Sequence, residues 1–432
     1  MSADTTPRRE PPTTPRWRVD VGPLRRSRQF RMLFVSQGVT FVGTMITAVA
    51  IPFQAYALSH SSLVVGLLSA AEVVPYLVVS FVGGSLADTR DRRWIVLLTE
   101  FGLCACTGAL VENATVGHGR LWVLFVVAAL TAVLGALGQP SLTALLPRVV
   151  ARADIPAASA LTSLRGNVGQ VVGPALAGGL ISWIHLGPTY AIDLGTFGIS
   201  LLVLSRMEPV PPLADQAGDA RPRLADGFRY ARGRPDLLGS YAVDMAAMFF
   251  GMPEALFPQL ATRFGGAAVL GLLYAAPALG GLIVSVTAGW VATVRRQGRA
   301  IVLAAGSWGL AIVVFGLARW LWLALAVLVI AGVFDMVSGL MRMTLWNLTV
   351  PDLLRGRMAG IELVSYSSGP ALGNVEAGIA ESLVGLRTSI VFGGIACVVA
   401  TAVVALLLPG LWRSDSGRPS IDAPERPAQE DG

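Results

Sequence analysis

Residues Gly83-Gly84-Ser85-Leu86-Ala87-Asp88-Thr89-Arg90-Asp91-Arg92-Arg93 form a short charged segment at the junction of two long apolar runs, 63–87 and 94–112. Each run has about the 20 residues that a helix needs to cross the hydrocarbon core of a bilayer. Because backbone groups cannot stay unpaired in lipid, a helix is the expected spanning element. The segment therefore predicts a loop at a membrane surface with a spanning helix on either side.

The composition of the whole chain agrees with a membrane protein. Of its 432 residues 54% are hydrophobic and only 14% are charged, and the mean hydropathy is +0.64. A soluble protein carries more charge, and a β-barrel would alternate in polarity over segments of about ten residues. All 33 basic residues are arginine. Basic loops at a membrane surface explain the pI of about 9.7, so we expect no nucleic-acid partner.

Twelve apolar runs predict twelve spanning helices in an all-α fold, six on each side of a polar linker rich in proline and arginine. They cover 33–58, 63–87, 94–112, 121–146, 157–184 and 189–205, and then 237–262, 268–293, 300–318, 321–347, 357–383 and 388–411. We expect two six-helix halves at 33–205 and 237–411, joined by a linker at 206–236. The tails at 1–32 and 412–432 are expected to be disordered.

Arginine placement predicts the orientation of these helices. Most arginines fall in the tails, the linker and the loops on one face. The opposite face has only Arg120, Arg263, Arg319 and Arg387. Cytoplasmic loops of membrane proteins carry such an excess, so we expect both termini in the cytoplasm.

The two halves repeat each other. The sequence Gly-Leu-Leu-Ser-Ala-Ala at 66–71 recurs as Gly-Leu-Leu-Tyr-Ala-Ala at 271–276, and Gly-Pro-Ala-Leu at 173–176 recurs at 369–372. Two six-helix halves in the same orientation imply a pseudo-two-fold axis along the membrane normal. Such repeats form their binding site at the interface of the halves.

The charged segment resembles the signature loop of the major facilitator superfamily, Gly-x-Leu-Ala-Asp-x-x-Gly-Arg-Arg/Lys. The matching residues are Gly84, Leu86, Ala87, Asp88, Arg92 and Arg93, whereas Asp91 stands in place of the usual glycine. The resemblance implies a twelve-helix transporter in which Gly84, Asp88, Arg92 and Arg93 belong to a cytoplasmic gate. Asp88 among arginines can form charge-assisted hydrogen bonds that hold one state closed. The alternative is a charged turn that only enforces topology.

The helix at 157–184 resembles the antiporter motif of drug exporters, Gly-x-x-x-Gly-Pro-x-x-Gly-Gly. Gly173 and Pro174 match its centre, and Ala177 replaces its first terminal glycine. A proline bends a helix, and small residues permit close packing. Arg165, Asn167 and Gln170 of the same helix are further candidates for a cavity. A packing face without directional meaning is the alternative.

Most of the chain resembles the drug and siderophore exporter branch that includes bacterial enterobactin exporters. Segments 224–230 and 351–357 add to the resemblance. It implies a monomer in the bacterial inner membrane that exports a bulky amphiphile in exchange for protons; its partners are the substrate, protons and the lipid bilayer. An importer or uniporter on the same fold and a non-transporting membrane sensor are the alternatives.

Ionisable residues inside spanning helices are costly and are functional candidates. Glu72 and Asp335 lie nearest mid-depth, and Glu254 and Glu376 lie in the outer halves of their helices. Desolvation favours the neutral form of a carboxyl group, so Glu72 and Asp335 are the first candidates for carrying protons. The available cations are Arg165 and Arg342, of which Arg342 is near the cytoplasmic end of its helix. Structural ion pairs and water-facing carboxylates are the alternative for each acid.

No pattern indicates an enzyme. The sequence has no Gly-x-x-x-x-Gly-Lys-Ser/Thr loop, and it has no lysine to complete one. The three histidines fall in separate loops, and the three cysteines fall within apolar runs. We therefore expect no catalytic residues, no cofactor and no metal site.

Overall fold

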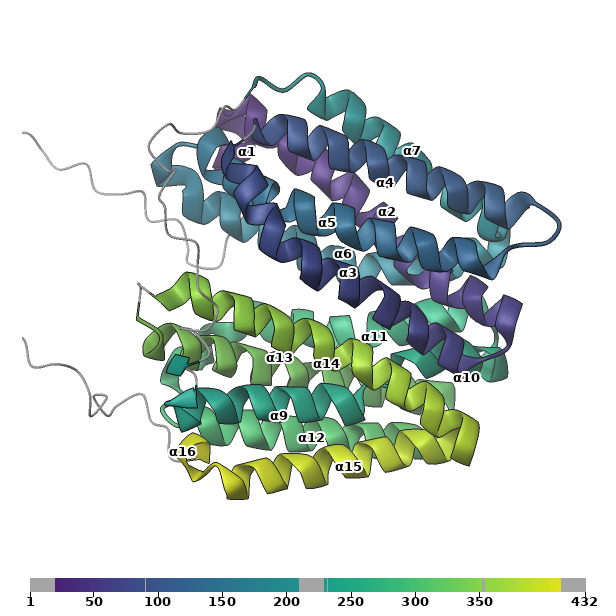
Figure 1. Ribbon diagram of the computed structural model, residues 1–432, viewed down its shortest axis with the longest axis vertical. Helices are drawn as coiled ribbons and strands as arrows, with labels where there is room; N and C mark the ends of the chain where they lie inside the picture. The colour runs from purple at the N-terminus through teal and green to yellow at the C-terminus, as the bar shows by residue number, and fades with distance from the viewer. Residues whose placement is uncertain (1–19, 90, 210–228, 231, 352–353, 413–432) are drawn as a thin grey trace, which may run out of the picture.

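The structure is a computed structural model that describes residues 20–89, 91–209, 229–230, 232–351 and 354–412. All regular elements among these residues are helices, and they form two bundles that lie side by side (Figure 1). Both ends of the described chain lie at the same end of the bundles. We call this end the tail side and the opposite end the far side.

The N-terminal bundle contains one short helix and six long ones. They are α1 (Gly22–Arg26), α2 (Arg28–Ser59), α3 (Ser62–Thr89), α4 (Arg92–Thr115), α5 (Leu121–Val149), α6 (Ile155–Ile184) and α7 (Leu186–Leu204). A 3-10 turn, η1 (Arg152–Asp154), leads into α6. Short turns between the long helices make neighbours antiparallel, so the chain crosses the bundle six times.

The C-terminal bundle repeats this path. Its helices are α9 (Pro235–Gly251), α10 (Phe257–Phe264), α11 (Ala267–Val286), α12 (Gln297–Leu317), α13 (Leu321–Thr349), α14 (Arg355–Val384), α15 (Leu386–Leu407) and α16 (Pro409–Trp412). Two 3-10 turns, η3 (Glu254–Leu256) and η4 (Ala288–Thr293), follow α9 and α11.

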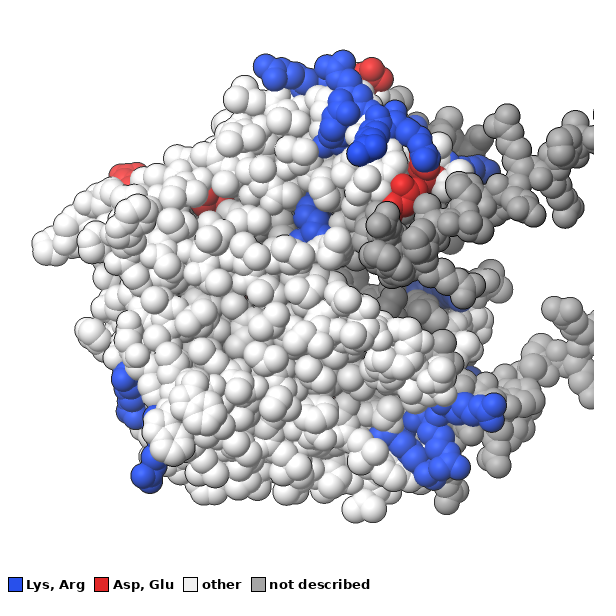
Figure 2. Space-filling view, turned by 180° about the vertical axis from the view of Figure 1, so that it is seen from behind, with Lys and Arg blue, Asp and Glu red and all other residues white. Residues whose placement is uncertain are grey.

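The prediction of twelve spanning helices in two halves is confirmed. Among the described residues, nine helices are long and apolar enough to cross a membrane. Helices α6 and α14 have 30 residues each but more polar side chains, and they are the tenth and eleventh spanning helices. The α9–η3–α10 segment is the twelfth. Arginine side chains gather at the two ends of the molecule, and the broad surface between them is almost free of charge (Figure 2), as a lipid-facing belt requires.

The seventh predicted helix, 237–262, is interrupted in the structure. Helix α9 ends at Gly251, and Met252 has extended backbone angles of φ −106° and ψ 91°. The cause is Pro253, because a proline disfavours the helical conformation of the residue before it and has no N–H to donate. Glu254, predicted within a continuous helix, therefore lies in the 3-10 turn at the break.

Polar groups at the charged segment fix the start of α4. Asp91, which replaces the signature glycine, is the N-cap residue, and its carboxylate accepts a hydrogen bond from the backbone N–H of Arg93 at 2.9 Å. Arg92 donates to the carbonyl of Ala144 near the end of α5 at 3.3 Å. Arg93 donates to the carbonyl of Leu204 at the end of α7 at 3.3 Å. Both arginines thus tie helix ends together within the N-terminal bundle.

Two glycines let helices from different bundles touch on the far side. A Cβ atom on Gly66 of α3 would lie 2.3 Å from the carbonyl oxygen of Asn374 in α14. A Cβ atom on Gly271 of α11 would lie 2.3 Å from the carbonyl oxygen of Pro174 in α6. Gly66 and Gly271 begin the repeated hexapeptide, so the repeat produces two equivalent contacts between the halves.

The close contact at Gly271 makes a stability prediction. Gly271→Ala places a methyl group between two backbones, and overpacking of this kind costs about 1–3 kcal/mol. We expect the thermal midpoint of the purified protein in detergent to fall by several degrees. Gly179→Ala on α6 is the matched control, because nothing lies within 4 Å of its added Cβ. An unchanged midpoint for Gly271→Ala would show that α6 and α11 do not meet in this way.

Candidate functional site

A cavity of about 420 Å³ lies between the two bundles. Residues of α2, α3 and α6 line it from the N-terminal half, and residues of η3, α11, α13 and α14 line it from the C-terminal half. Three mid-helix prolines, Pro52, Pro174 and Pro277, are among them. A proline leaves one carbonyl of the preceding turn without its helical donor, so the walls offer backbone acceptors as well as side chains.

Three carboxyl groups meet in this central cavity. Glu72 comes from α3, Glu254 from η3 and Asp335 from α13. Glu72 lies deep in the protein and is still exposed, because it faces the cavity. The carboxyl groups of Glu254 and Asp335 are close enough to interact electrostatically. None of the described lining residues is arginine or histidine, and none of the three acids takes part in an ion pair between described residues.

Amide side chains line the same cavity. Asn167 and Gln170 of α6, both expected from the sequence, face it from the N-terminal half. Asn374 of α14 is a third, which no sequence motif indicates. Its Nδ2 donates to the hydroxyl of Ser69 in α3 at 3.2 Å, and its Oδ1 accepts from the backbone N–H of Ala255 at 3.0 Å. Asn374 therefore joins α3 of one half to the helix break of the other.

Side chains also bind two backbone carbonyls next to the helix break. The indole N–H of Trp308 in α12 donates to the carbonyl of Gly251 at 3.1 Å. The hydroxyl of Tyr274 in α11 donates to the carbonyl of Glu254 at 3.4 Å. Because an unpaired backbone group costs several kcal/mol in lipid, these partners allow the chain to break beside the cavity.

The remaining sequence candidates lie elsewhere. Gly173 packs against Met45, and its added Cβ would lie 2.3 Å from the Met45 Cβ. The guanidinium of Arg165 lies 5.7 Å from the ring centre of Phe34. Glu376 is half-buried and is not among the lining residues. The side chain of Asp88 and the surroundings of Gly84 lie outside the described part of the structure.

A second pocket of about 340 Å³ lies on the tail side of the C-terminal half, and we call it the tail-side pocket. Its polar and aromatic lining residues are Tyr241, Asp244, Arg342, Trp346, Asn347, Glu362, Ser365 and Tyr366. Arg342 forms an ion pair with Asp244 at 2.5 Å. Asp244 is an ionisable residue in a predicted spanning helix, so the criterion that selected Glu72 also applies to it.

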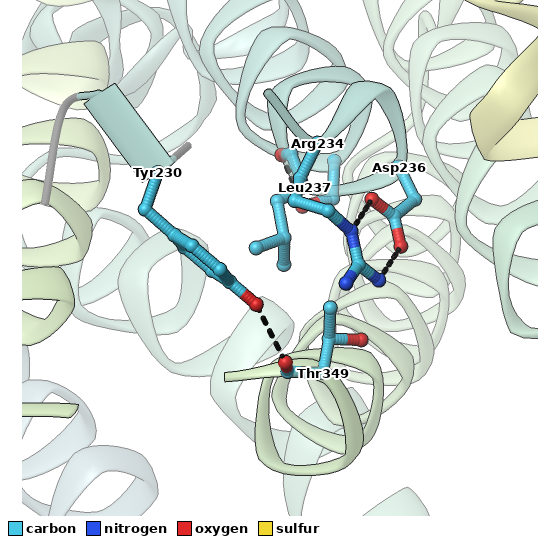
Figure 3. Close-up of polar contacts among 6 residues, drawn as sticks. Tyr230, Arg234, Asp236, Leu237 and Thr349 are labelled. Atoms are coloured by element: carbon cyan, nitrogen blue, oxygen red, sulfur yellow. Dashed lines mark hydrogen bonds and ion pairs between the residues drawn. The ribbon is translucent and has the colours of Figure 1, made fainter. Parts of the chain in front are cut away.

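The described end of the linker is attached to the tail-side ends of α9 and α13 (Figure 3). The hydroxyl of Tyr230 donates to the carbonyl of Thr349 at the end of α13 at 2.9 Å. Arg234 binds both carboxylate oxygens of Asp236 at the start of α9, at 3.1 and 2.8 Å. Tyr230 packs in the same hydrophobic cluster as Tyr241 and Trp346 of the pocket. The linker is thus fixed to the ends of α9 and α13.

The groups that line the central cavity suit the binding of a small molecule. In the described part of the chain no group of three His, Cys, Asp or Glu side chains could hold a metal ion. The central cavity instead combines carboxyl groups, amides and apolar walls between two bundles. Such a site can hold an amphiphilic molecule.

Comparison with known proteins assigns the family. The family model described as transmembrane secretion effector matches residues 19–429. The enterobactin exporter EntS of Citrobacter koseri is 28% identical over 400 residues, covering 92% of this chain and 96% of the relative. The enterobactin exporter EntS of Shigella boydii serotype 4 is 27% identical over 410 residues, covering 94% and 98%.

Solved structures share the fold at low sequence identity. The nucleoside transporter NupG superposes with a TM-score of 0.70 at 12% identity, covering 88% of this chain and 99% of that chain. A bacterial homologue of the human lysosomal transporter Spinster, in an inward-facing and unoccupied conformation, gives 0.67 at 16% identity, covering 89% and 97%. The chain belongs to the transmembrane secretion effector family of the major facilitator superfamily, and it is a multi-pass efflux transporter rather than an enzyme.

Proposed function

We propose that the chain exports a bulky amphiphilic small molecule from a bacterial cytoplasm in exchange for protons. The observation that carries the proposal is the meeting of Glu72, Glu254 and Asp335 in the central cavity, with no cation among its described lining residues. A desolvated carboxyl group prefers its neutral form, and a ligand in the cavity changes that preference. A proton and a substrate can therefore alternate at the same groups.

The walls of the cavity fit an amphiphile. Apolar side chains such as Met45, Leu68 and Met336 cover much of it, and Asn167 and Gln170 add hydrogen-bonding groups. The relatives are named as exporters of enterobactin, which makes a siderophore the first substrate to test. An antibiotic or another drug is the wider class that the resemblance implies.

Arginine placement supports a cytoplasmic tail side. Arg25, Arg26, Arg92 and Arg93 lie at the tail-side ends of the N-terminal bundle. The far side carries few arginines, among them Arg120. With the tails inside, the glycine contacts close the outer face and the described conformation faces inward. One chain encloses the whole cavity, so we infer that the monomer is the transporting unit and that it lies in the inner membrane.

The signature loop has a proposed role in the opposite state. When the tail side closes, Asp88 approaches cations there and holds the gate by charge-assisted hydrogen bonds. Gly84 permits the close approach of helix ends that this closure needs. Arg92 and Arg93, already anchored to the ends of α5 and α7, provide a rigid frame for the loop.

Proton coupling is tested with carboxyl variants in proteoliposomes. Glu72→Gln, Glu254→Gln and Asp335→Asn each remove one proton-binding group. We expect at least one of them to lose enterobactin-induced proton movement by about tenfold or more, because a single embedded carrier is essential to coupling. Binding of enterobactin should persist.

Glu112→Gln is the matched control, because Glu112 is exposed at the far-side end of α4. It should couple normally. If all three cavity variants still exchange protons for substrate, the central acids are not the carriers and Glu376 becomes the next candidate. Uptake of enterobactin that does not depend on a proton gradient would contradict the proposal as a whole.

The gate is tested with Asp88→Asn, which keeps the size of the side chain and removes its charge. Transport should fall by about tenfold, the loss expected for a charge-assisted hydrogen bond, while membrane insertion stays normal. Asp154→Asn is the control, since Asp154 forms a tail-side ion pair with the exposed Arg26 and such pairs contribute little. If Asp88→Asn exports at the wild-type rate, Asp88 does not hold the tail side closed.

The orientation is tested with reporter fusions. Fusions after His60, His118 and His185 should report an external location, and fusions within 210–220 should report the cytoplasm, because arginine-rich segments stay inside. Activity of an alkaline phosphatase reporter measures the first group, and fluorescence of a cytoplasmic reporter measures the second. An external 210–220 segment would reverse the assignment of the two sides.

A further inference from the structure

The tail-side pocket has an uncompensated negative charge. Arg342 is paired with Asp244, and Glu362 of α14 interacts electrostatically with both. Asp335, the next acid on α13, also acts on Arg342. Among the described side chains that line the pocket, Arg342 is the one cation against two carboxylates. An anionic ligand would therefore meet an excess of negative charge here.

Two buried hydrogen-bond donors in the same pocket, on Ser365 and Arg342, have no partner among the described residues. The hydroxyl of Ser365, a residue only 8% exposed, is buried without a hydrogen bond. The Arg342 Nε is buried in the same way, whereas the Tyr241 hydroxyl and the Trp346 indole N–H are buried next to each other and interact. A guanidinium nitrogen can only donate, and an unpaired buried donor costs about 1–3 kcal/mol. Acceptor oxygens of a bound molecule would satisfy them.

Aromatic rings complete the lining. Tyr241 and Trp346 lie next to each other, and Tyr366 of α14 is 51% exposed. Tyr366 also approaches Tyr76 of α3 in the other half, so the pocket opens toward the space between the bundles. Rings of this kind bind organic cations over their faces, and tryptophan binds them best.

We propose that the tail-side pocket is a second substrate-binding site, and that it takes an organic cation whose apolar body carries acceptor oxygens. The inference rests on the proposed export function and adds organic cations to it, as one class within the antibiotics and drugs proposed beside siderophores. Arg342 follows Asp335 by two helical turns on α13, about 10 Å along the axis. A molecule that enters from the tail side thus meets this pocket before it reaches the central cavity.

The probes for the test are two dyes with the same xanthene framework. Tetramethylrhodamine methyl ester is a cation with acceptor oxygens, and fluorescein is an anion at neutral pH. Fluorescence anisotropy measures the binding of each dye to the full-length protein in detergent micelles, with empty micelles as the blank. We expect the cation to bind about tenfold tighter than the anion, as one uncompensated charge predicts. Equal affinities would overturn the assignment of a cation site.

Variants then locate the binding site. Glu362→Gln should weaken binding of the cation by about fivefold to tenfold, and Trp346→Phe by about threefold or more. Glu112→Gln, which removes the same charge at the far-side end of α4, should change nothing. The elution profile of each variant on size exclusion checks its folding. Trp346→Phe keeps an aromatic ring at this position, so it changes the packing of the pocket little and serves as a second, independent variant.

The outcomes separate this inference from the proposed export function. If Glu362→Gln and Trp346→Phe bind the cation like the wild type while Glu72→Gln weakens it, the ligand uses the central cavity alone and the second site is wrong. If the cation binds in the pocket as expected and proton-driven transport is absent in the wild type, the export proposal fails and the binding site stands.

Discussion

Backbone contact between the two halves is the constraint on which the rest of the structure depends. In lipid no hydrophobic effect drives helices together, so close packing of small residues must do so. Gly66 meets the carbonyl of Asn374, and Gly271 meets the carbonyl of Pro174. Both contacts lie on the far side, so they close the cavity there.

The far-side contact and the wall of the cavity share a residue. The carbonyl of Asn374 packs on Gly66, while its side chain binds Ser69 of α3 and the N–H of Ala255 beside the helix break. A movement that separates α3 from α14 must break the Ser69 hydrogen bond and disturb the support of Ala255. Glu254 precedes Ala255, so closure of the far side and the placement of this carboxyl group are mechanically linked.

The sequence contains most of the fold because spanning helices are set by length, hydropathy and charge. It does not contain the break in the seventh helix. Pro52, Pro174 and Pro277 leave their helices continuous, whereas Pro253 ends one. The difference is tertiary, because Trp308 and Asn374 satisfy the freed backbone groups at that place. The sequence around Pro253 does not indicate these partners, because Trp308 and Asn374 lie far from it in the chain.

The same limit applies to the site. Glu72 and Asp335 stand out as acids in apolar runs, and the structure brings both to the central cavity together with Glu254. Asp244 has the same signal and could be found by the same criterion. Asn374 could not, since its role depends on α3, η3 and α14, three segments far apart in the chain.

Helix α13 links the central cavity and the tail-side pocket electrostatically. Asp335 and Arg342 are two turns apart on one face, about 10 Å along the axis. At that distance two unit charges interact by about 1.5 kcal/mol at an effective dielectric constant of about 20. A change of charge at Asp335, by a proton or a bound cation, therefore changes the equilibrium constant for pairing of Arg342 with Asp244 and Glu362 by about tenfold. When Asp335 is neutral, it no longer attracts the Arg342 guanidinium, which then interacts more strongly with Asp244 and Glu362. The charge in the central cavity therefore affects the tail-side pocket without direct contact.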